Sequence, residues 1–130
     1  MKSFVLKNLL LSGSLFCIAF SSCNGNLDSS ASNITTIDSL LQKARETNVP
    51  AAMHQAFEEV KTLQNDSVKM NYYTHIAYLL ANSTDSTFFK QVNEEALLLA
   101  RKLGDTLHMG EGYWHYGIHY MQWQDYGQSY

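Results

Sequence analysis

Two segments of the chain decide its fold: YTHIAYLL at residues 73–80 and YWHYGIHY at residues 113–120. The two align at a spacing of forty residues, so that Tyr73 returns as Tyr113. In both segments large residues surround one small residue at helical spacing, the pattern of a helix that a second helix approaches closely. A repeat of this period predicts stacked helical hairpins, because a single hairpin cannot bury its apolar face.

Helical periodicity and turn residues continue on both sides of these segments. They predict helices at about residues 36–47, 50–64, 68–81, 87–103 and 106–123, and the start of a sixth near residue 126. Pro50 fits the first turn of the second helix, Asp66 or Ser67 can cap the third, and Gly104 and Asp105 suit the end of one helix and the start of the next. No segment alternates as a strand does, so the expected fold class is all-α, a helical-hairpin solenoid that is incomplete at its C-terminus.

The N-terminal residues have the features of a signal peptide rather than of the folded domain. Lys2 and Lys7 precede an apolar stretch at residues 9–20, which is shorter than the roughly 20 residues that span a bilayer as a helix. The stretch ends in Phe-Ser-Ser-Cys at residues 20–23, which resembles the lipobox of bacterial lipoproteins, with Phe20 where Leu is usual. This resemblance implies a signal peptide at residues 1–22, a lipid on Cys23 and a location in the bacterial envelope, facing the periplasm or the exterior. A secreted product and an uncleaved anchor are the alternatives.

After such cleavage the chain would be acidic and would have a polar start. Residues 23–35 offer almost nothing to bury, which predicts a flexible tether ahead of a domain at residues 36–130. The remaining 7 Lys and Arg face 12 Asp and Glu, a balance that argues against nucleic acid as a partner. Cys23 would be the only cysteine left, so no disulfide or cysteine-based metal site is expected.

The two aligned segments resemble the tetratricopeptide repeat family. The matching residues are Tyr73, Ile76, Ala77, Leu80, Asp85, Phe89 and Ala96 in one repeat, and Tyr113, Tyr116, Gly117, Tyr120, Asp125, Tyr126 and Ser129 in the next. The chain departs from the family at Phe89, where Ala is usual, at Tyr116, where Leu is usual, and at Gln124, where Gly is usual. The resemblance implies a right-handed solenoid with repeats at residues 69–109 and 110–130, the second of them truncated.

A narrower resemblance suggests a function. Residues 94–105 (EEALLLARKLGD) look like the longer repeats in the extracytoplasmic sensor regions of histidine kinases and transcription regulators of the Bacteroidetes. The resemblance implies a protein- or peptide-binding module, the sensor part of a two-component signalling protein. No phosphoacceptor box, nucleotide-binding glycine motif or nucleophile motif occurs. We therefore expect no enzyme and no cofactor; kinase activity would require that the chain be part of a longer sensor kinase.

The family geometry also implies which residues face a concave groove. They are Asn71, Thr74, Tyr78 and Ala81 in the earlier repeat, and Glu111, Trp114, Ile118 and Met121 in the later one. Such a surface is mixed apolar and polar, which suits a peptide strand or helix. We expect the binding energy to come from aromatic anchors such as Trp114 and Tyr78.

Other interpretations compete for the aromatic C-terminal segment. Glu111, His115 and His119 lie at i, i+4 and i+8 and could offer metal ligands, but ligands on one straight helix seldom enclose an ion, and we expect no metal. The aromatic residues could stack sugar rings, as in surface glycan-binding lipoproteins of the starch-utilisation type, although Tyr113, Tyr116 and Tyr120 already have packing roles in the repeat pattern. The same aromatic helix could dock on a partner or on a second copy of the chain.

Overall fold

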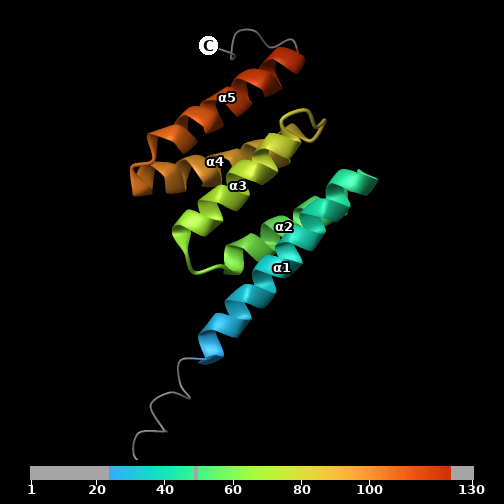
Figure 1. Cartoon of the computed structure of the whole chain (residues 1–130). Coiled ribbons are helices and arrows are strands. Elements are labelled where there is room, and N and C mark those ends of the chain that lie inside the picture. Colours follow the sequence, from blue (N-terminus) through green and yellow to red (C-terminus); the bar gives the residue numbers. More distant parts are fainter. Residues whose placement is uncertain (1–23, 49, 124–130) are drawn as a thin grey trace, which may run out of the picture. The chain divides into compact units, whose positions relative to one another are not determined.

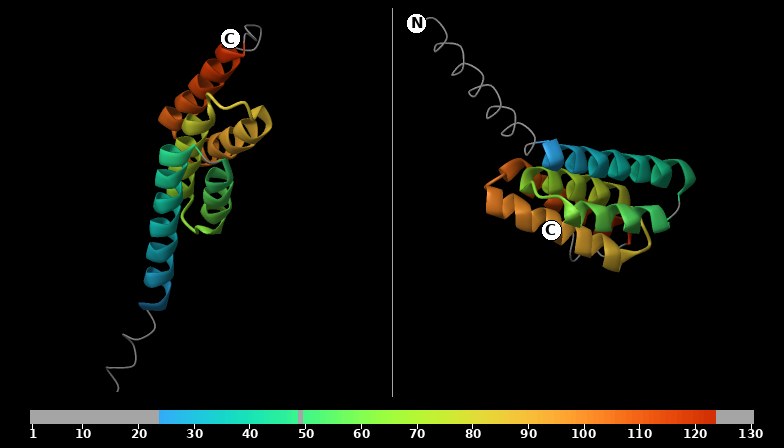
Figure 2. Two further views of the ribbon diagram at one scale, coloured as in Figure 1. Left: turned by 90° about the vertical axis from the view of Figure 1, so that its right-hand side faces the viewer. Right: turned by 90° about the horizontal axis from the view of Figure 1, so that it is seen from below.

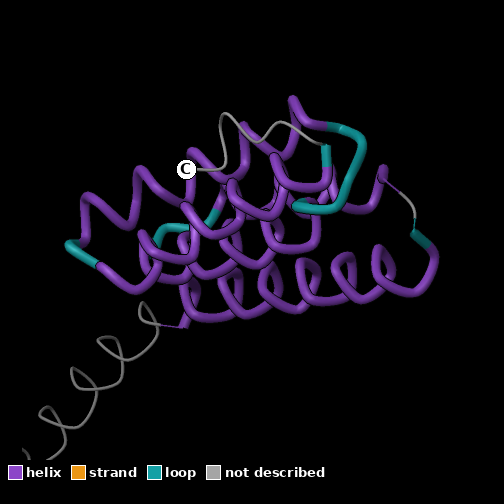
Figure 3. The backbone as a smooth tube through the Cα atoms, turned by 90° about the horizontal axis from the view of Figure 1, so that it is seen from above, coloured by secondary structure: helices purple, strands orange, loops and turns teal. Residues whose placement is uncertain are grey.

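The structure, a computed structural model, describes residues 24–48 and 50–123 (Figure 1). These residues form five helices: α1 (Asn24–Thr47), α2 (Pro50–Thr62), α3 (Asp66–Leu80), α4 (Ser86–Leu103) and α5 (Thr106–Gln122). Only helices and loops occur in this part of the chain (Figure 3). The all-α prediction is confirmed. The expected sixth helix, near residue 126, lies outside the described residues.

The first helix begins earlier than predicted. α1 starts at Asn24 rather than near Thr36, so the described part of the expected tether is helical. The polar composition of residues 24–35 therefore did not predict their secondary structure. The segment contains no proline that would stop a helix, and each residue added to an existing helix gains a hydrogen bond without a new nucleation step. By its contacts the chain divides within α1, between Ile34 and Thr35.

The helix ends follow from their capping residues. Asn48 ends α1 with a left-handed backbone (φ 50°), and its N–H donates to the carbonyl oxygen of Ala44 at 3.0 Å. Asn65, not Asp66 or Ser67, caps α3, because its side-chain oxygen accepts from the N–H groups of Ser67 and Val68.

The later caps agree with the sequence. The Asp105 side chain accepts from the N–H of His108 at the start of α5, as predicted. Asp85 caps α4 in the same way, through the N–H of Phe88. Gly104 ends α4 at φ 70°, a left-handed conformation in which a side chain would be strained.

Within residues 35–123 the helices alternate between two layers. α1, α3 and α5 lie in one layer and α2 and α4 in the other (Figure 2). α3 is central, since it packs against α2, α4 and α5, and α4 also packs against α5. The largest fully buried side chains are Ile37, Phe57, Val60, Ile76, Phe89, Val92, Asn93, Leu97 and His119.

The close approach of α4 and α5 depends on a glycine. A Cβ on Gly112 would lie 2.6 Å from a methyl carbon of Leu97, so any other residue would have to displace this buried side chain. The Nδ2 group of Asn93 donates to the carbonyl oxygen of the same glycine at 2.9 Å in the buried interface. These contacts fix the position of α5, which carries part of the candidate site.

The aligned residues Tyr73 and Tyr113 differ in environment, contrary to the packing role expected for Tyr113. Tyr73 is 3% exposed and packs against Phe57 of α2, whereas Tyr113 is 58% exposed and its hydroxyl accepts a hydrogen bond from Arg101. α3 lies between α2 and α4, but α5 has a described helix of the second layer on one side only. Tyr116 and Tyr120 are half-buried, so their expected packing role is partly met.

Candidate functional site

Two neighbouring depressions lie along the layer formed by α1, α3 and α5. The α1–α3 depression has a volume of about 800 Å³ and is lined by Asp38, Leu41, Gln42, Arg45, Glu46, Val68, Asn71, Tyr72 and His75. The α3–α5 depression has a volume of about 370 Å³ and is lined by Asn71, Thr74, His75, Tyr78, His108, Glu111, Trp114 and His115. Because Asn71 and His75 line both, the two depressions adjoin, and together they extend over three helices. We call this surface the groove.

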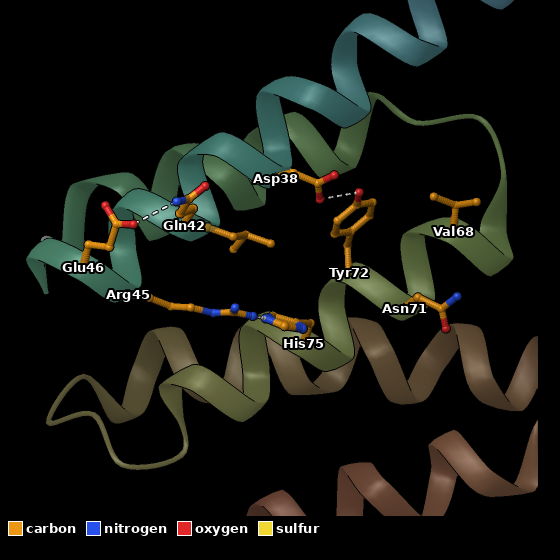
Figure 4. A pocket seen from close by; sticks show the side chains of 9 residues that line it. Asp38, Gln42, Arg45, Glu46, Val68, Asn71, Tyr72 and His75 are labelled. Carbon is orange, nitrogen blue, oxygen red and sulfur yellow. Dashed lines mark hydrogen bonds between the residues drawn. The ribbon is translucent and has the colours of Figure 1, made fainter.

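The α1–α3 depression is framed by polar side chains that bond across it. The Tyr72 hydroxyl of α3 donates to the Asp38 carboxylate of α1 at 2.8 Å (Figure 4). Burial, and then the neighbouring carboxylate, raise the pKa of Tyr72 to about 12, so the phenol stays protonated as a donor. On α1 the Gln42 amide donates to the Glu46 carboxylate at 2.8 Å.

A second hydrogen bond across the same depression joins Arg45 to His75. The Arg45 guanidinium of α1 donates to the Nε2 atom of His75 on α3 (Figure 4). Burial lowers the pKa of His75, and the nearby positive charge of Arg45 lowers it further. His75 is therefore a neutral acceptor at neutral pH, and this pair leaves the imidazole without a charge.

The α3–α5 depression is dominated by two exposed aromatic rings. Tyr78 and Trp114 lie with ring centroids 6.4 Å apart and planes only 12° from parallel, and they are 53% and 57% exposed. The buried ring of His115 lies 5.9 Å from Tyr78 and 5.6 Å from Trp114. Large exposed rings held by a buried neighbour are typical anchors for a binding partner.

Two buried polar atoms of this depression lack partners. Thr74 Oγ1 and His115 Nδ1 have no hydrogen bond to any described residue, although Thr74 is 9% exposed and His115 only 3%. Burial lowers the pKa of His115, against a smaller opposing effect of Glu111. The imidazole is therefore neutral at neutral pH. Unsatisfied buried polar atoms are uncommon in folded proteins and often mark functional sites.

The stripe of Glu111, His115 and His119 does not form a metal site in the described part of the chain. Glu111 lines the groove, but His119 is 1% exposed and bonds elsewhere. Its Nδ1 atom donates to the carbonyl oxygen of Ala81, and its Nε2 atom bonds to the Ser86 hydroxyl, both at 2.9 Å. No three His, Cys, Asp or Glu side chains among the described residues lie close enough together to hold a metal ion.

Most residues predicted for the groove from the repeat pattern lie together. Asn71, Thr74, Tyr78, Glu111 and Trp114 all line the α3–α5 depression. Three others do not. Ala81 is buried at the end of α3, Ile118 is half-buried, and Met121 is 60% exposed beyond the groove lining.

The repeat pattern missed the α1 side of the groove. Asp38 and Arg45 were not predicted because residues before about Met70 match the repeat only as a helical hairpin. A signal was present on α3, where Asn71, His75 and Tyr78 recur at i, i+4 and i+7 and so share one face. A polar face of this kind, on a helix whose other faces are buried, indicates a surface that is open to solvent or to a ligand.

Comparison with known proteins identifies no relative: no protein family, curated protein or solved structure matches the chain. Cys23, the expected lipidation site, lies outside the described residues. No helix in the described part of the chain combines the length and apolar character needed to cross a membrane.

Proposed function

We propose that the chain is a peptide- or protein-binding module whose ligand lies in the groove across α1, α3 and α5. The observation that carries the proposal is that the two depressions adjoin: they share Asn71 and His75, and the exposed pair Tyr78 and Trp114 lines one of them. An extended or helical peptide can span adjacent depressions, while aromatic anchors supply much of the binding energy. The Ser86 hydroxyl does bond to the His119 imidazole, but His119 is 1% exposed and lies outside the lining of the groove, so this pair carries no catalytic proposal.

The proposed architecture is a tetratricopeptide-like right-handed solenoid. The alternation of helices between two layers supports it, as does the packing of α3 against both α2 and α4 (Figure 2). In such arrays the first helix of each hairpin lines one continuous surface. α1, α3 and α5 would be these first helices, and the groove would be that surface.

The proposed setting is the bacterial envelope, with the module anchored by a lipid on Cys23. The charged N-terminal residues, the apolar stretch and the Phe-Ser-Ser-Cys sequence at residues 20–23 support this proposal. A sensor role in two-component signalling would follow from the resemblance of residues 94–105 to extracytoplasmic sensor repeats. Incorporation of radiolabelled palmitate into the chain, but not into its Cys23→Ser variant, is the expected result. Equal labelling of both would exclude this anchor.

The binding proposal is tested with short random peptides displayed on phage and selected on the immobilised full chain. Selected peptides, labelled and followed by fluorescence anisotropy, should bind saturably. Asn71→Trp should abolish this binding, because Asn71 is exposed and lines both depressions. Gln55→Trp, an equal change at an exposed position of α2 in the other layer, should leave it intact. Failure to select any peptide, or equal loss in both variants, would refute the groove proposal.

A glycan-binding role is the second candidate, favoured by the exposed pair Tyr78 and Trp114. Aromatic faces of this kind can stack on sugar rings, and a bound sugar would alter the fluorescence of Trp114. Titration with maltooligosaccharides should leave the tryptophan emission unchanged if the ligand is a peptide. A saturable change that Trp114→Ala removes would favour the glycan instead.

Self-association is proposed as a further property of the aromatic helix. Leu107 and Tyr113 of α5, and Trp123 directly after it, are 69%, 58% and 48% exposed, and Glu111 is the only Asp, Glu, Lys or Arg residue of α5. A helix with this many exposed apolar side chains is typical of contact with another protein. Sedimentation velocity over a range of concentrations should show a dimer that Tyr113→Glu dissociates, while a monomer at every concentration would rule the contact out.

A further inference from the structure

The charges along the groove are unequal. Three carboxylates line it, those of Asp38, Glu46 and Glu111, against the single guanidinium of Arg45. His75 and His115 add no positive charge at neutral pH, because burial lowers the pKa of each. His108, the third histidine of the lining, bonds to the carboxylate of Asp105 at 2.8 Å. A negatively charged groove favours ligands that carry positive charge.

The three carboxylates differ in what holds them. Asp38 accepts a hydrogen bond from Tyr72, and Glu46 accepts one from Gln42. Glu111 has no hydrogen bond or ion pair with any described residue, although it is only half-exposed. It is the carboxylate of the groove that has both oxygens free of hydrogen bonds to described residues.

Aromatic faces lie beside this carboxylate. Glu111 and Trp114 are three residues apart on α5, which places them on neighbouring turns of one face, and Tyr78 lies across from them on α3. The face of an aromatic ring attracts a cation through its quadrupole, most strongly for Trp, and an adjacent carboxylate adds to this attraction. Aromatic faces and a carboxylate together provide the chemistry that recognises a lysine or arginine side chain.

Unsatisfied polar atoms occur in the same depression. Thr74 Oγ1 and the Nδ1 atom of His115 are buried and lack partners among the described residues. Both can accept a hydrogen bond, the imidazole nitrogen in the tautomer that carries its proton on Nε2. Neither atom is exposed to solvent, so a lysine or arginine N–H group would reach them only after the covering side chains move.

We propose that the α3–α5 depression is a subsite for one lysine or arginine side chain of a peptide ligand, which lies against Tyr78 and Trp114 with its charge facing Glu111. The inference rests on the proposed peptide-binding function and specifies which kind of residue the ligand places at this point of the groove. The α1–α3 depression, where Asp38 and Arg45 already have partners, would hold the neighbouring part of the peptide.

The test is a double-mutant cycle between protein and peptide. Peptides selected on the full chain should share a lysine or arginine at one position, and its replacement by norleucine should weaken binding about threefold to thirtyfold. Glu111→Gln should weaken binding of the cationic peptide about twofold to fivefold and leave the norleucine peptide unaffected. Anisotropy of labelled peptides gives all four affinities, and the Glu111 effect should shrink at high salt.

Matched variants separate the subsite from general effects of charge and of apolar surface. Glu59→Gln removes the same charge from α2, in the other layer, and should not discriminate between the two peptides. Trp114→Leu keeps an apolar side chain but removes the ring, and it should reduce the preference for the cationic peptide. Trp123→Leu, at a similarly exposed tryptophan, should not.

The outcomes distinguish the two proposals. If peptides bind but share no basic position, or if Glu111→Gln weakens both peptides equally, the cationic subsite is refuted while peptide binding in the groove stands. If no peptide is selected and none binds, the groove proposal fails and the subsite fails with it. Circular dichroism of each variant shows whether it remains folded.

Discussion

Tyr78 of α3 and Trp114 of α5 face each other across the α3–α5 depression, with ring planes 12° from parallel and centroids 6.4 Å apart. Because both rings are more than half exposed, neither is needed to fill the core. Trp114→Ala should therefore weaken binding of a selected peptide by about 2 kcal/mol or more, as expected for a central aromatic anchor. The helical circular dichroism should not change. A loss of helicity in this variant would instead show that Trp114 supports the fold.

The contact between α4 and α5 leads to a prediction for two glycines. Gly112→Ala should lower the free energy of unfolding by about 1–3 kcal/mol, because the new Cβ would lie 2.6 Å from the side chain of the buried Leu97. Gly110→Ala should raise it by about 0.5–1 kcal/mol, since nothing lies within 4 Å of a Cβ there and alanine favours a helix. Urea denaturation measures both. Equal effects of the two substitutions would contradict the described packing of α5.

The buried His119 should be important for stability rather than for binding. His119→Ala removes two hydrogen bonds, to the carbonyl oxygen of Ala81 and the hydroxyl of Ser86, and leaves a cavity beside Phe89. We expect a loss of about 2–4 kcal/mol in urea denaturation. Ser86→Ala, which removes one partner, should cost about 1 kcal/mol. A stable His119→Ala variant that loses peptide binding would show that this histidine belongs to the site.

Two of the three histidines that line the groove, His75 and His115, predict a dependence of stability on pH. Burial lowers the pKa of both His75 and His115 from the usual 6.5. Each histidine then binds fewer protons in the folded than in the unfolded chain. The free energy of unfolding therefore rises with pH between the pKa of the histidine in the folded chain and its higher pKa in the unfolded chain. Their contribution is complete above pH 6.5 and is lost as the pH falls through the lowered pKa.

Thermal unfolding across this range provides the measurement. The Tm should decrease as the pH falls below 6.5, and a variant carrying both His75→Gln and His115→Gln should show a smaller decrease. Hydrogen bonds from Lys102 and from the N–H of His108 lower the pKa of Asp66 and of Asp105, respectively, from the usual 3.8. Protonation of these two carboxylates also lowers the Tm on acidification, but only at pH values near or below 3.8. A Tm that rises on acidification through 6.5 would contradict the described burial of these histidines.

Helix identity and most helix ends could be predicted from local sequence. Gly104 and Asp105 determine the turn between α4 and α5 by backbone conformation and capping, which require no knowledge of the rest of the fold. The start of α1 could not be predicted, because residues 24–35 have the composition of a tether and no local signal for a helix start. Asn65 was missed as a cap because three neighbouring residues can all serve, and the chosen one depends on geometry.

The α3 and α5 part of the groove was accessible through the repeat, whereas other features depend on distant contacts. Tyr73 and Tyr113 are equivalent in sequence, but their burial differs because it depends on which helices cover them. His119 resembles an exposed polar residue in sequence, yet its partners lie more than thirty residues away, at Ala81 and Ser86. Arg45 could not be paired with His75 without knowing that α1 lies beside α3.

The central claim is that the ligand lies along α1, α3 and α5. The most direct test is the amide NMR spectrum of the labelled chain during titration with a selected peptide. We expect shifts on these three helices, largest near His75 and Trp114, and little change on α2 or on the face of α4 directed away from α5. Shifts confined to α2 and α4, or spread evenly over all five helices, would contradict the proposed groove.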